Sequence, residues 1–379
     1  MSSTSAPAAF APWENPTEKP LIEFQNVTKR FGEFTAIDNL NLKIYEQEFF
    51  ALLGPSGCGK TTLMRMLAGF ETSTEGTILL DGQDIAPVPP NKRAVNMMFQ
   101  SYALFPHLSI EENIAFGLKR EGMPKNDIAD RVTEMLRLTR LEKFAHRKPH
   151  QISGGQRQRV ALARSLAKAP KLLLLDEPLG ALDKKLRQDT QFELMDIQEK
   201  TGTTFVIVTH DQEEAMTVAS RVAVMDHGKL MQVATPDKLY EYPENVYVAD
   251  FIGEVNLIEG KAESTGKRAY SVHWDENATA LNAETETELS NGQSCTIAIR
   301  PEKVAISADK PDGAANAVEG QIIDIAYLGN LSTYYVKLAN GQMVKAQTAN
   351  TRRLSRRSFT WEDKVWLSWT ATAGVVLKG

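Results

Sequence analysis

Cysteine is scarce in this sequence of 379 residues, which contains only Cys58 and Cys295. Two cysteines cannot build the disulfide framework of a small secreted protein, and their number is typical of a reducing compartment. The cysteine and histidine spacings that hold structural zinc are missing as well. Disulfide-stapled and zinc-finger folds are therefore excluded.

Long hydrophobic runs are also missing. The longest apolar runs, such as Leu172–Leu175, lie between charged residues and fall far short of the roughly 20 residues that span a bilayer. The first twenty residues have neither the basic segment nor the apolar core of a secretory signal. The sequence therefore predicts a chain that does not cross a membrane and works in the cytoplasm.

Neither sign of charge is in large excess, because 43 Lys and Arg residues face 48 Asp and Glu residues, a net charge of −5. This balance does not favour a protein that coats nucleic-acid phosphates. Basic pairs at Arg352–Arg353 and Arg356–Arg357 are interpreted as a solvated face. Hydrophobic residues at 42% and charged residues at 24% are ordinary for a globular protein. We expect a folded protein without a nucleic-acid partner.

Strand-like and helical segments alternate over residues 21–253, which predicts an α/β domain with a mostly parallel sheet. The continuous apolar run Thr204–Val208 is typical of a strand buried on both faces. Over about residues 104–167 the pattern becomes helical, with segments such as Lys125–Leu138, and predicts an inserted helical subdomain. Residues 1–20, rich in proline and serine, predict a mobile, disordered tail.

Residues 254–379 have a different character and predict a second domain, a small β-barrel. Ser294–Ser307 and Ile322–Val344 are rich in Ile, Val, Tyr and Thr, and Asn340–Gly341 is a strong hairpin signal. The acidic stretch Asp275–Ser290 predicts a loop or an edge strand.

The run Gly54–Thr61 fits the pattern G-x-x-x-x-G-K-[ST]. Phe49–Leu53 before it has the composition of a strand, and Thr61–Leu67 after it that of a helix, which is the context a phosphate-binding loop requires. Glycines let successive N–H groups turn toward phosphate oxygens at a helix N-terminus. Lys60 would then neutralise the β- and γ-phosphates, and the Thr61 hydroxyl would ligate Mg²⁺.

A buried strand followed by Asp176 and Glu177 supplies acidic groups for the same site. A parallel strand delivers such residues to the edge of the sheet where ligands bind. Asp176 suits the Mg²⁺ shell and Glu177 suits a general base for the attacking water. Taken alone, such a pair is equally often a helix cap or a salt-bridge partner.

The segment Ile152–Gln156 predicts a second anion site. Ser153, Gly154 and Gly155 precede a helix expected to start near Gln156, which exposes a hydroxyl and free N–H groups at a positive helix end. With this segment the sequence resembles the nucleotide-binding subunits of ATP-binding-cassette (ABC) transporters over essentially the whole chain. The resemblance implies a RecA-like P-loop ATPase core followed by a TOBE-type, OB-like barrel.

The family motifs occur in order, and the resemblance assigns residues to them. They are an adenine-stacking Phe31; the ATP-binding residues Gly54, Pro55, Ser56, Gly57, Cys58, Gly59, Lys60, Thr61 and Thr62; the Q-loop Gln100; the signature residues Ser153, Gly154, Gly155 and Gln156; the acidic pair Asp176 and Glu177; the D-loop Asp183; and the switch histidine His210.

Roles follow from the resemblance. Glu177, His210, Gln100 and Lys60 are expected to be catalytic, and Thr61, Gln100 and Asp176 to hold Mg²⁺. The signature is expected to contact ATP bound to a second copy, which predicts a homodimer with two composite sites. Taken singly, His210 is more often a structural residue and Phe31 a core residue. The family more commonly has tyrosine at the position of Phe31, leucine at Ile152 and serine at Gly180.

An ATPase of this family without membrane spans implies two transmembrane permease subunits as partners and, indirectly, a periplasmic solute receptor. Segments such as Arg300–Val304 and Ala326–Leu331 resemble importer ATPases, most closely those of bacterial polyamine uptake, with putrescine as solute. The implied location is the cytoplasmic face of the bacterial inner membrane.

Other interpretations remain open. The solute could be spermidine, an oligosaccharide or ferric iron, and the barrel could regulate the ATPase. A non-transport ABC protein of DNA repair or the ribosome is disfavoured, because Lys60 and Asp176 are too close in sequence for a long coiled-coil insertion and the chain has one cassette.

Overall fold

The computed structural model describes residues 10–180, 184–276, 278–285, 288–351 and 358–378. The chain divides into two compact units, Met1–Pro236 and Asp237–Gly379, which are described separately. The sequence prediction instead sets a boundary after residue 253, and the limits 21–253 and 254–379 stay proposals. Within the described residues, no helix is both long enough and apolar enough to span a bilayer.

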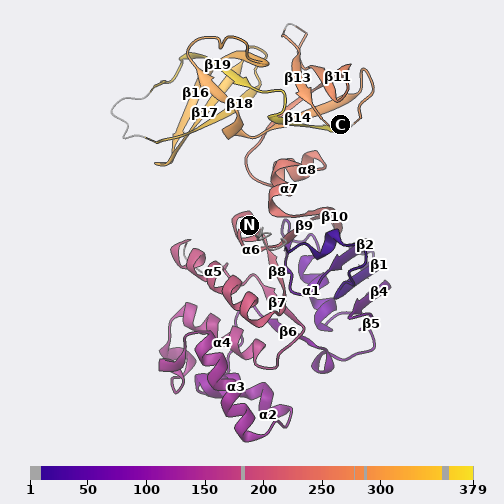
Figure 1. Ribbon diagram of the computed structural model, residues 1–379, viewed down its shortest axis with the longest axis vertical. Helices are drawn as coiled ribbons and strands as arrows, with labels where there is room; N and C mark the ends of the chain where they lie inside the picture. Colours follow the sequence, from indigo (N-terminus) through magenta and orange to yellow (C-terminus); the bar gives the residue numbers. More distant parts are fainter. Residues whose placement is uncertain (1–9, 181–183, 277, 286–287, 352–357, 379) are drawn as a thin grey trace, which may run out of the picture. The chain divides into compact units, whose positions relative to one another are not determined.

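A six-stranded sheet with the order β10-β9-β3-β8-β7-β6 forms the centre of the first unit (Figure 1). All neighbouring strands are parallel except β10, which is antiparallel to β9. The strands are β3 (Phe49–Leu53), β6 (Val95–Met98), β7 (Leu172–Asp176), β8 (Thr204–Thr209), β9 (Arg221–Asp226) and β10 (Lys229–Ala234). The predicted parallel sheet is confirmed, and β3 and β8 are buried along their whole length, as expected for strands covered on both faces.

An antiparallel sheet with the order β2-β1-β4-β5 faces this sheet. Its strands are β1 (Ile22–Phe31), β2 (Phe34–Ile44), β4 (Glu75–Leu80) and β5 (Gln83–Asp84). Helix α1 (Lys60–Ala68) lies between the two sheets (Figure 1), and its Leu63 and Leu67 share one buried cluster with Phe24 and Leu52. Burial on both sides therefore fixes the helix that follows the phosphate loop.

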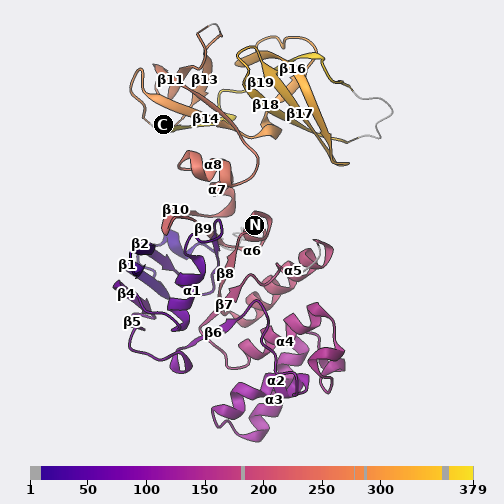
Figure 2. The same ribbon diagram turned by 180° about the vertical axis from the view of Figure 1, so that it is seen from behind.

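The predicted helical subdomain contains α2 (Ile110–Arg120), α3 (Lys125–Leu138) and α4 (Gly154–Leu166), which pack on one another (Figures 1 and 2). Helix α2 begins with a capping box in which Ser109 and Glu112 satisfy each other's backbone N–H groups. Helix α3 has the predicted bounds. The chain then returns to the core through β7, α5 (Lys184–Thr201) and α6 (Gln212–Val218).

The disordered tail predicted over residues 1–20 stays a prediction, but its described part, residues 10–20, contains a regular element. Pro12–Glu14 form a short 3-10 helix, and the guanidinium of Arg221 lies 4.9 Å from the ring centroid of Trp13. Arg221 in turn forms an ion pair with Glu48, whose side chain is fully buried. The aromatic ring covers a buried ion pair, and this contact orders a proline-rich segment that composition alone marks as mobile.

Two five-stranded antiparallel sheets form most of the second unit and enclose one core (Figure 2). Their orders are β13-β12-β11-β14-β20 and β15-β19-β16-β17-β18. The elements are α7 (Pro236–Glu241), α8 (Val246–Phe251), β11 (Asn256–Gly266), β12 (Ala269–His273), β13 (Leu281–Glu284), β14 (Ser294–Ile299), β15 (Ala305–Ser307), β16 (Asn316–Tyr327), β17 (Leu331–Leu338), β18 (Met343–Ala349), β19 (Lys364–Trp369) and β20 (Gly374–Lys378).

Two local predictions in this unit are confirmed. Asn340–Gly341 lies in the turn between β17 and β18, with Gly341 at φ 89°. The acidic stretch Asp275–Ser290 contains β13, which is the edge strand of its sheet.

Candidate functional site

The loop Gly54–Gly59 connects the buried strand β3 to helix α1. Gly59, the residue before the helix, has φ 106°, a backbone conformation that side-chain-bearing residues rarely adopt. A Cβ atom there would lie 2.6 Å from the carbonyl oxygen of Ala36, so β2 presses against the loop. Among the described residues no side chain caps α1, which leaves its first N–H groups open toward the loop, as an anion-binding helix N-terminus requires.

Lys60 is the first residue of α1, and its side chain is buried at 6% exposure. Its ammonium donates to the carbonyl oxygens of Gly54, at 2.7 Å, and Pro55, at 2.8 Å. The loop therefore curls around a positive charge. Thr61 is exposed next to it, whereas the Cys58 side chain faces the interior at 3% exposure.

The acidic pair lies at the end of β7. Asp176 is the last residue of the strand, and burial, followed by the charge of Glu177, raises its pKa, which the charge of Arg65 opposes. Glu177 follows in a left-handed conformation with φ 43°, and its N–H donates to the Val208 carbonyl at 3.0 Å. This backbone bond to β8 fixes the turn that presents the Glu177 carboxylate.

The carboxylate of Glu177 brings together three of the predicted residues. The Gln100 Nε2 donates to Glu177 Oε2 at 3.1 Å, and the His210 Nδ1 lies 3.0 Å from Glu177 Oε1. Gln100 follows β6, Glu177 follows β7 and His210 follows β8, three neighbouring parallel strands. The next strand in the sheet is β3, which leads into the phosphate loop. Four adjacent strand ends therefore carry one polar site, at the edge where open α/β sheets bind ligands.

The predicted metal ligands fit a hard cation. Thr61 offers a hydroxyl oxygen and Asp176 a half-buried carboxylate whose charge is poorly solvated. Gln100 donates to Glu177 through Nε2, which leaves its amide oxygen as the donor atom toward a metal. Hydroxyl, carboxylate and amide oxygens are ligands suited to Mg²⁺.

The signature segment lies at the N-terminus of α4, in the helical subdomain. Ser153 caps the helix, with its hydroxyl accepting from the Gln156 N–H at 3.3 Å, and Gln156 Oε1 accepts from the Ser153 N–H at 2.9 Å. The helix starts at Gly154, two residues before the expected start, because this capping box recruits both glycines into the first turn. In both ribbon views α4 lies on the far side of β6 and β7 from α1 (Figures 1 and 2).

Of the remaining predicted site residues, the structure describes Phe31 but not Asp183. Phe31 ends β1 with its side chain 47% exposed, and the Lys29 ammonium lies 4.7 Å from its ring centroid. Phe31 pairs with Phe34 of β2, the strand that presses on Gly59, so its ring is available for stacking near the phosphate loop. Asp183 lies outside the described residues.

Comparisons with known proteins agree on both parts of the chain. A family model described as ABC transporter matches residues 37–180, and one described as TOBE domain matches residues 297–377. The chain is 52% identical to the putrescine transport ATP-binding protein PotG of Escherichia coli, over 94% of this chain and 95% of that protein. It is 47% identical to the spermidine/putrescine import ATP-binding protein PotA of Rubrobacter xylanophilus, over 94% of each.

Solved structures match the cassette. The dimeric structure of MJ0796, a bacterial ABC transporter cassette, is 34% identical with a TM-score of 0.50 and covers 57% of this chain and 98% of its own. The structure of cbiO1 from Clostridium perfringens is 27% identical with a TM-score of 0.55 and covers 59% of this chain and 91% of its own.

A buried carboxylate that the sequence analysis missed lies behind His210. Glu214 of α6 is 2% exposed, accepts from the Thr209 hydroxyl at 2.5 Å, and has an Oε1 without a hydrogen-bond partner among the described residues. Burial raises its pKa from 4.5 to about 7, although the Thr209 hydroxyl opposes the shift. No pattern in the sequence marks this residue, since a glutamate in a first helical turn is ordinary.

Glu214→Gln should remove a pH-dependent loss of stability. The folded chain holds the Glu214 proton more tightly than the unfolded chain, so the free energy of unfolding falls as pH rises from 4.5 to about 7. The contribution is about 3 kcal/mol at full ionisation. Urea unfolding should therefore show that the free energy of unfolding decreases less from pH 5 to pH 8 in Glu214→Gln than in the wild type. Glu213→Gln, on the exposed side of α6, is the control, and an equal decrease in all three proteins would contradict this account.

Proposed function

We propose a function from one premise: this chain belongs to the ABC transporter family of ATP-binding proteins. In that family it is an ATP-hydrolysing motor subunit, which couples the binding and hydrolysis of ATP to solute uptake through membrane partners. The observation that carries the proposal is the carboxylate of Glu177, held between Gln100 and His210 at the end of β7, in the same parallel sheet as the strand that leads into the phosphate loop.

ATP is assigned to the loop Gly54–Thr62, with the phosphates over the N-terminus of α1 and the adenine on Phe31. Lys60 now donates to two loop carbonyls and would exchange them for β- and γ-phosphate oxygens, which are stronger acceptors. Thr61, Asp176 and Gln100 would hold Mg²⁺. When bound, this ion neutralises phosphate charge.

Hydrolysis is assigned to water attack on the γ-phosphorus. The water oxygen bonds to phosphorus as the bond to the ADP oxygen breaks, and Glu177 accepts the water proton as general base. His210 and Gln100 hold the carboxylate from both sides, which keeps it in one orientation. His210 would also reach the γ-phosphate. Positioning supplies much of the rate in phosphoryl transfer, and three residues on three strand ends give that precision.

A second copy is assigned to complete each site. The signature residues Ser153–Gln156 form a helix N-terminus that lies away from α1 in the same chain (Figure 1). An ATP on the phosphate loop of one chain would then meet the signature of its partner, in an isologous dimer. The dimeric cassette structures among the relatives support this arrangement. Asp183, in the same motif series, would contribute at that interface.

The solute is assigned from the relatives. PotG is a putrescine transport ATP-binding protein and PotA a spermidine/putrescine import ATP-binding protein, and both match along nearly the whole chain. We therefore propose polyamine import, with putrescine as solute. The partners would be two transmembrane permease subunits and, indirectly, a periplasmic receptor, which places the chain at the cytoplasmic face of the bacterial inner membrane.

Glu177→Gln should keep ATP binding and lower hydrolysis by roughly 10²- to 10⁴-fold, the range for a lost general base. The amide is isosteric and can still contact Gln100 and His210, so only the proton acceptor is lost. Steady-state phosphate release and equilibrium binding of a fluorescent ATP analogue measure the two effects. Hydrolysis within about threefold of the wild type would assign the base elsewhere, because a lost general base costs far more than that.

Uptake of labelled putrescine tests the cellular function. Cells that lack this gene should recover uptake with the wild-type chain but not with Glu177→Gln, because transport requires hydrolysis. Spermidine, maltose and ferric iron run in parallel. Rescue of another solute alone would keep the motor function and overturn the solute, and rescue by Glu177→Gln would overturn the coupling to hydrolysis.

A further inference from the structure

The segment around Gln100 is attached to one helix on both sides, through β6 before it and through the loop after it. Before Gln100, the Asn96 Nδ2 donates to the Ser165 carbonyl at 2.6 Å. After it, Arg164 donates from Nη1 to the Ala103 carbonyl at 2.8 Å and from Nη2 to the Tyr102 carbonyl at 2.9 Å. Arg164 and Ser165 are consecutive residues at the end of α4.

Arg164 holds a backbone turn that would otherwise relax. Tyr102 and Ala103 have φ values of 61° and 44°, left-handed conformations that are unfavourable for residues with a Cβ. In this turn both carbonyl oxygens point at one planar guanidinium. Because the guanidinium is rigid, a rotation or shift of the loop would break at least one of the two hydrogen bonds. The guanidinium also lies 5.5 Å from the ring centroid of Phe105, so the clamp extends along the loop.

A buried asparagine fixes the far end of the same loop. Asn113 of α2 is fully buried; its Oδ1 accepts from the Phe105 N–H at 2.9 Å, and its Nδ2 donates to the Phe105 carbonyl at 3.1 Å. Tyr102 is half-buried, and burial raises the pKa of its hydroxyl, which the charge of Arg157, the residue after the signature, opposes. The loop after Gln100 is therefore bonded to helices of the helical subdomain at both of its ends.

We propose that Arg164 is a positioning residue for hydrolysis: by clamping Tyr102 and Ala103 to the end of α4, it holds the Gln100 amide against Glu177. Helix α4 carries the signature at its other end, so the same rigid element sets the position of Gln100 and of Ser153. This inference rests on the proposed ATPase function and adds to it the residue that ties Gln100 to the signature helix.

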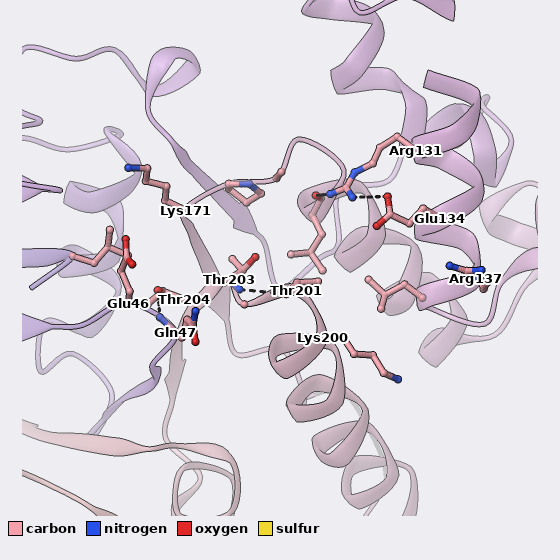
Figure 3. A pocket seen from close by; sticks show the side chains of 16 residues that line it. Glu46, Gln47, Arg131, Glu134, Arg137, Lys171, Lys200, Thr201, Thr203 and Thr204 are labelled. Carbon is pink, nitrogen blue, oxygen red and sulfur yellow. Dashed lines mark hydrogen bonds and ion pairs between the residues drawn. The ribbon is translucent and has the colours of Figure 1, made fainter. Parts of the chain in front are cut away.

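Arg131 is a matched control within the same subdomain. It also donates to two backbone carbonyls at the end of α4, those of Leu166 and Ala167, both at 2.9 Å. These contacts border a cavity of about 690 Å³ that also reaches Gln47, which precedes β3, and Thr204, the first residue of β8 (Figure 3). Arg131 therefore has the same chemistry and the same helix end, but it faces the amino ends of the strands and not Gln100.

A double-mutant cycle on the full chain tests the proposal. Arg164→Met should lower the single-turnover rate of labelled ATP by about tenfold or more, the scale for a misplaced reacting group, with the KM for ATP changed by less than about twofold. In a Gln100→Ala background the same substitution should change the rate by less than about twofold, because its effect passes through Gln100. Arg131→Met should change the rate by the same small factor in both backgrounds.

Hydrogen exchange of the Tyr102–Phe105 amides gives a readout that does not depend on activity. Exchange should accelerate in Arg164→Met and stay unchanged in Arg131→Met. Where Arg164→Met does not fold, Arg164→Lys enters the same cycle, because one ammonium cannot replace the planar two-carbonyl contact.

Two results would overturn the positioning role. One is that Arg164→Met lowers the single-turnover rate by the same factor with Gln100 and with Gln100→Ala. The other is that Arg131→Met lowers this rate as much as Arg164→Met does. If the wild-type chain hydrolyses ATP but the effects of Arg164→Met and Gln100→Ala are additive, this inference alone is refuted. A wild-type chain without hydrolysis refutes the proposed function with it.

Discussion

The carboxyl ends of four adjacent parallel strands determine where the candidate site lies. The sheet order β3-β8-β7-β6 places the phosphate loop, His210, Glu177 and Gln100 next to one another, although the sequence spreads them over residues 54–210. Strands β3 and β8 are buried along their whole length and β7 up to its last residue, so their ends cannot shift without disturbing the core. The positions of the polar groups are therefore set by apolar packing beneath them.

The composite site that we propose needs more than this sheet. The sheet edge supplies the loop, the acidic pair and the histidine, but the signature belongs to the helical subdomain, at the N-terminus of α4. The chain crosses between core and subdomain through the loop after Gln100, which Arg164 and Asn113 hold to the helices. This loop therefore contacts both the site, through Gln100, and the helix that carries the signature, through Arg164. That arrangement suits a motor whose chemistry depends on a second chain.

Sequence reasoning found the groups whose chemistry is local and missed those whose role comes from long-range contacts. Gly54–Thr61 and Glu177 were predictable, because a strand, a glycine-rich turn and a terminal acid form a pattern within a few residues. Arg164 was not, because an arginine on a helix surface has the pattern of a solvated charge, and its partners lie about sixty residues away.

Burial and aromatic packing produced the other differences. Glu214 has the sequence context of an exposed first-turn glutamate, and only the packing of α6 removes it from water. The segment around Trp13 has the composition of a mobile tail, yet its ring covers the Arg221–Glu48 pair. The antiparallel sheet of β1, β2, β4 and β5 was not predicted either, since parallel and antiparallel neighbours share the same strand patterns.

The central claim is that a second chain completes each ATP site, and sedimentation velocity tests it most directly. Glu177→Gln with Mg²⁺ and ATP should sediment as a dimer, because bound ATP that is not hydrolysed holds the two chains together. Adding Ser153→Arg to this variant should keep ATP binding but return the protein to a monomer, since a bulky charge would fill the space for the partner's phosphate. A dimer that forms equally well with Ser153→Arg, or none in either variant, would contradict the composite site.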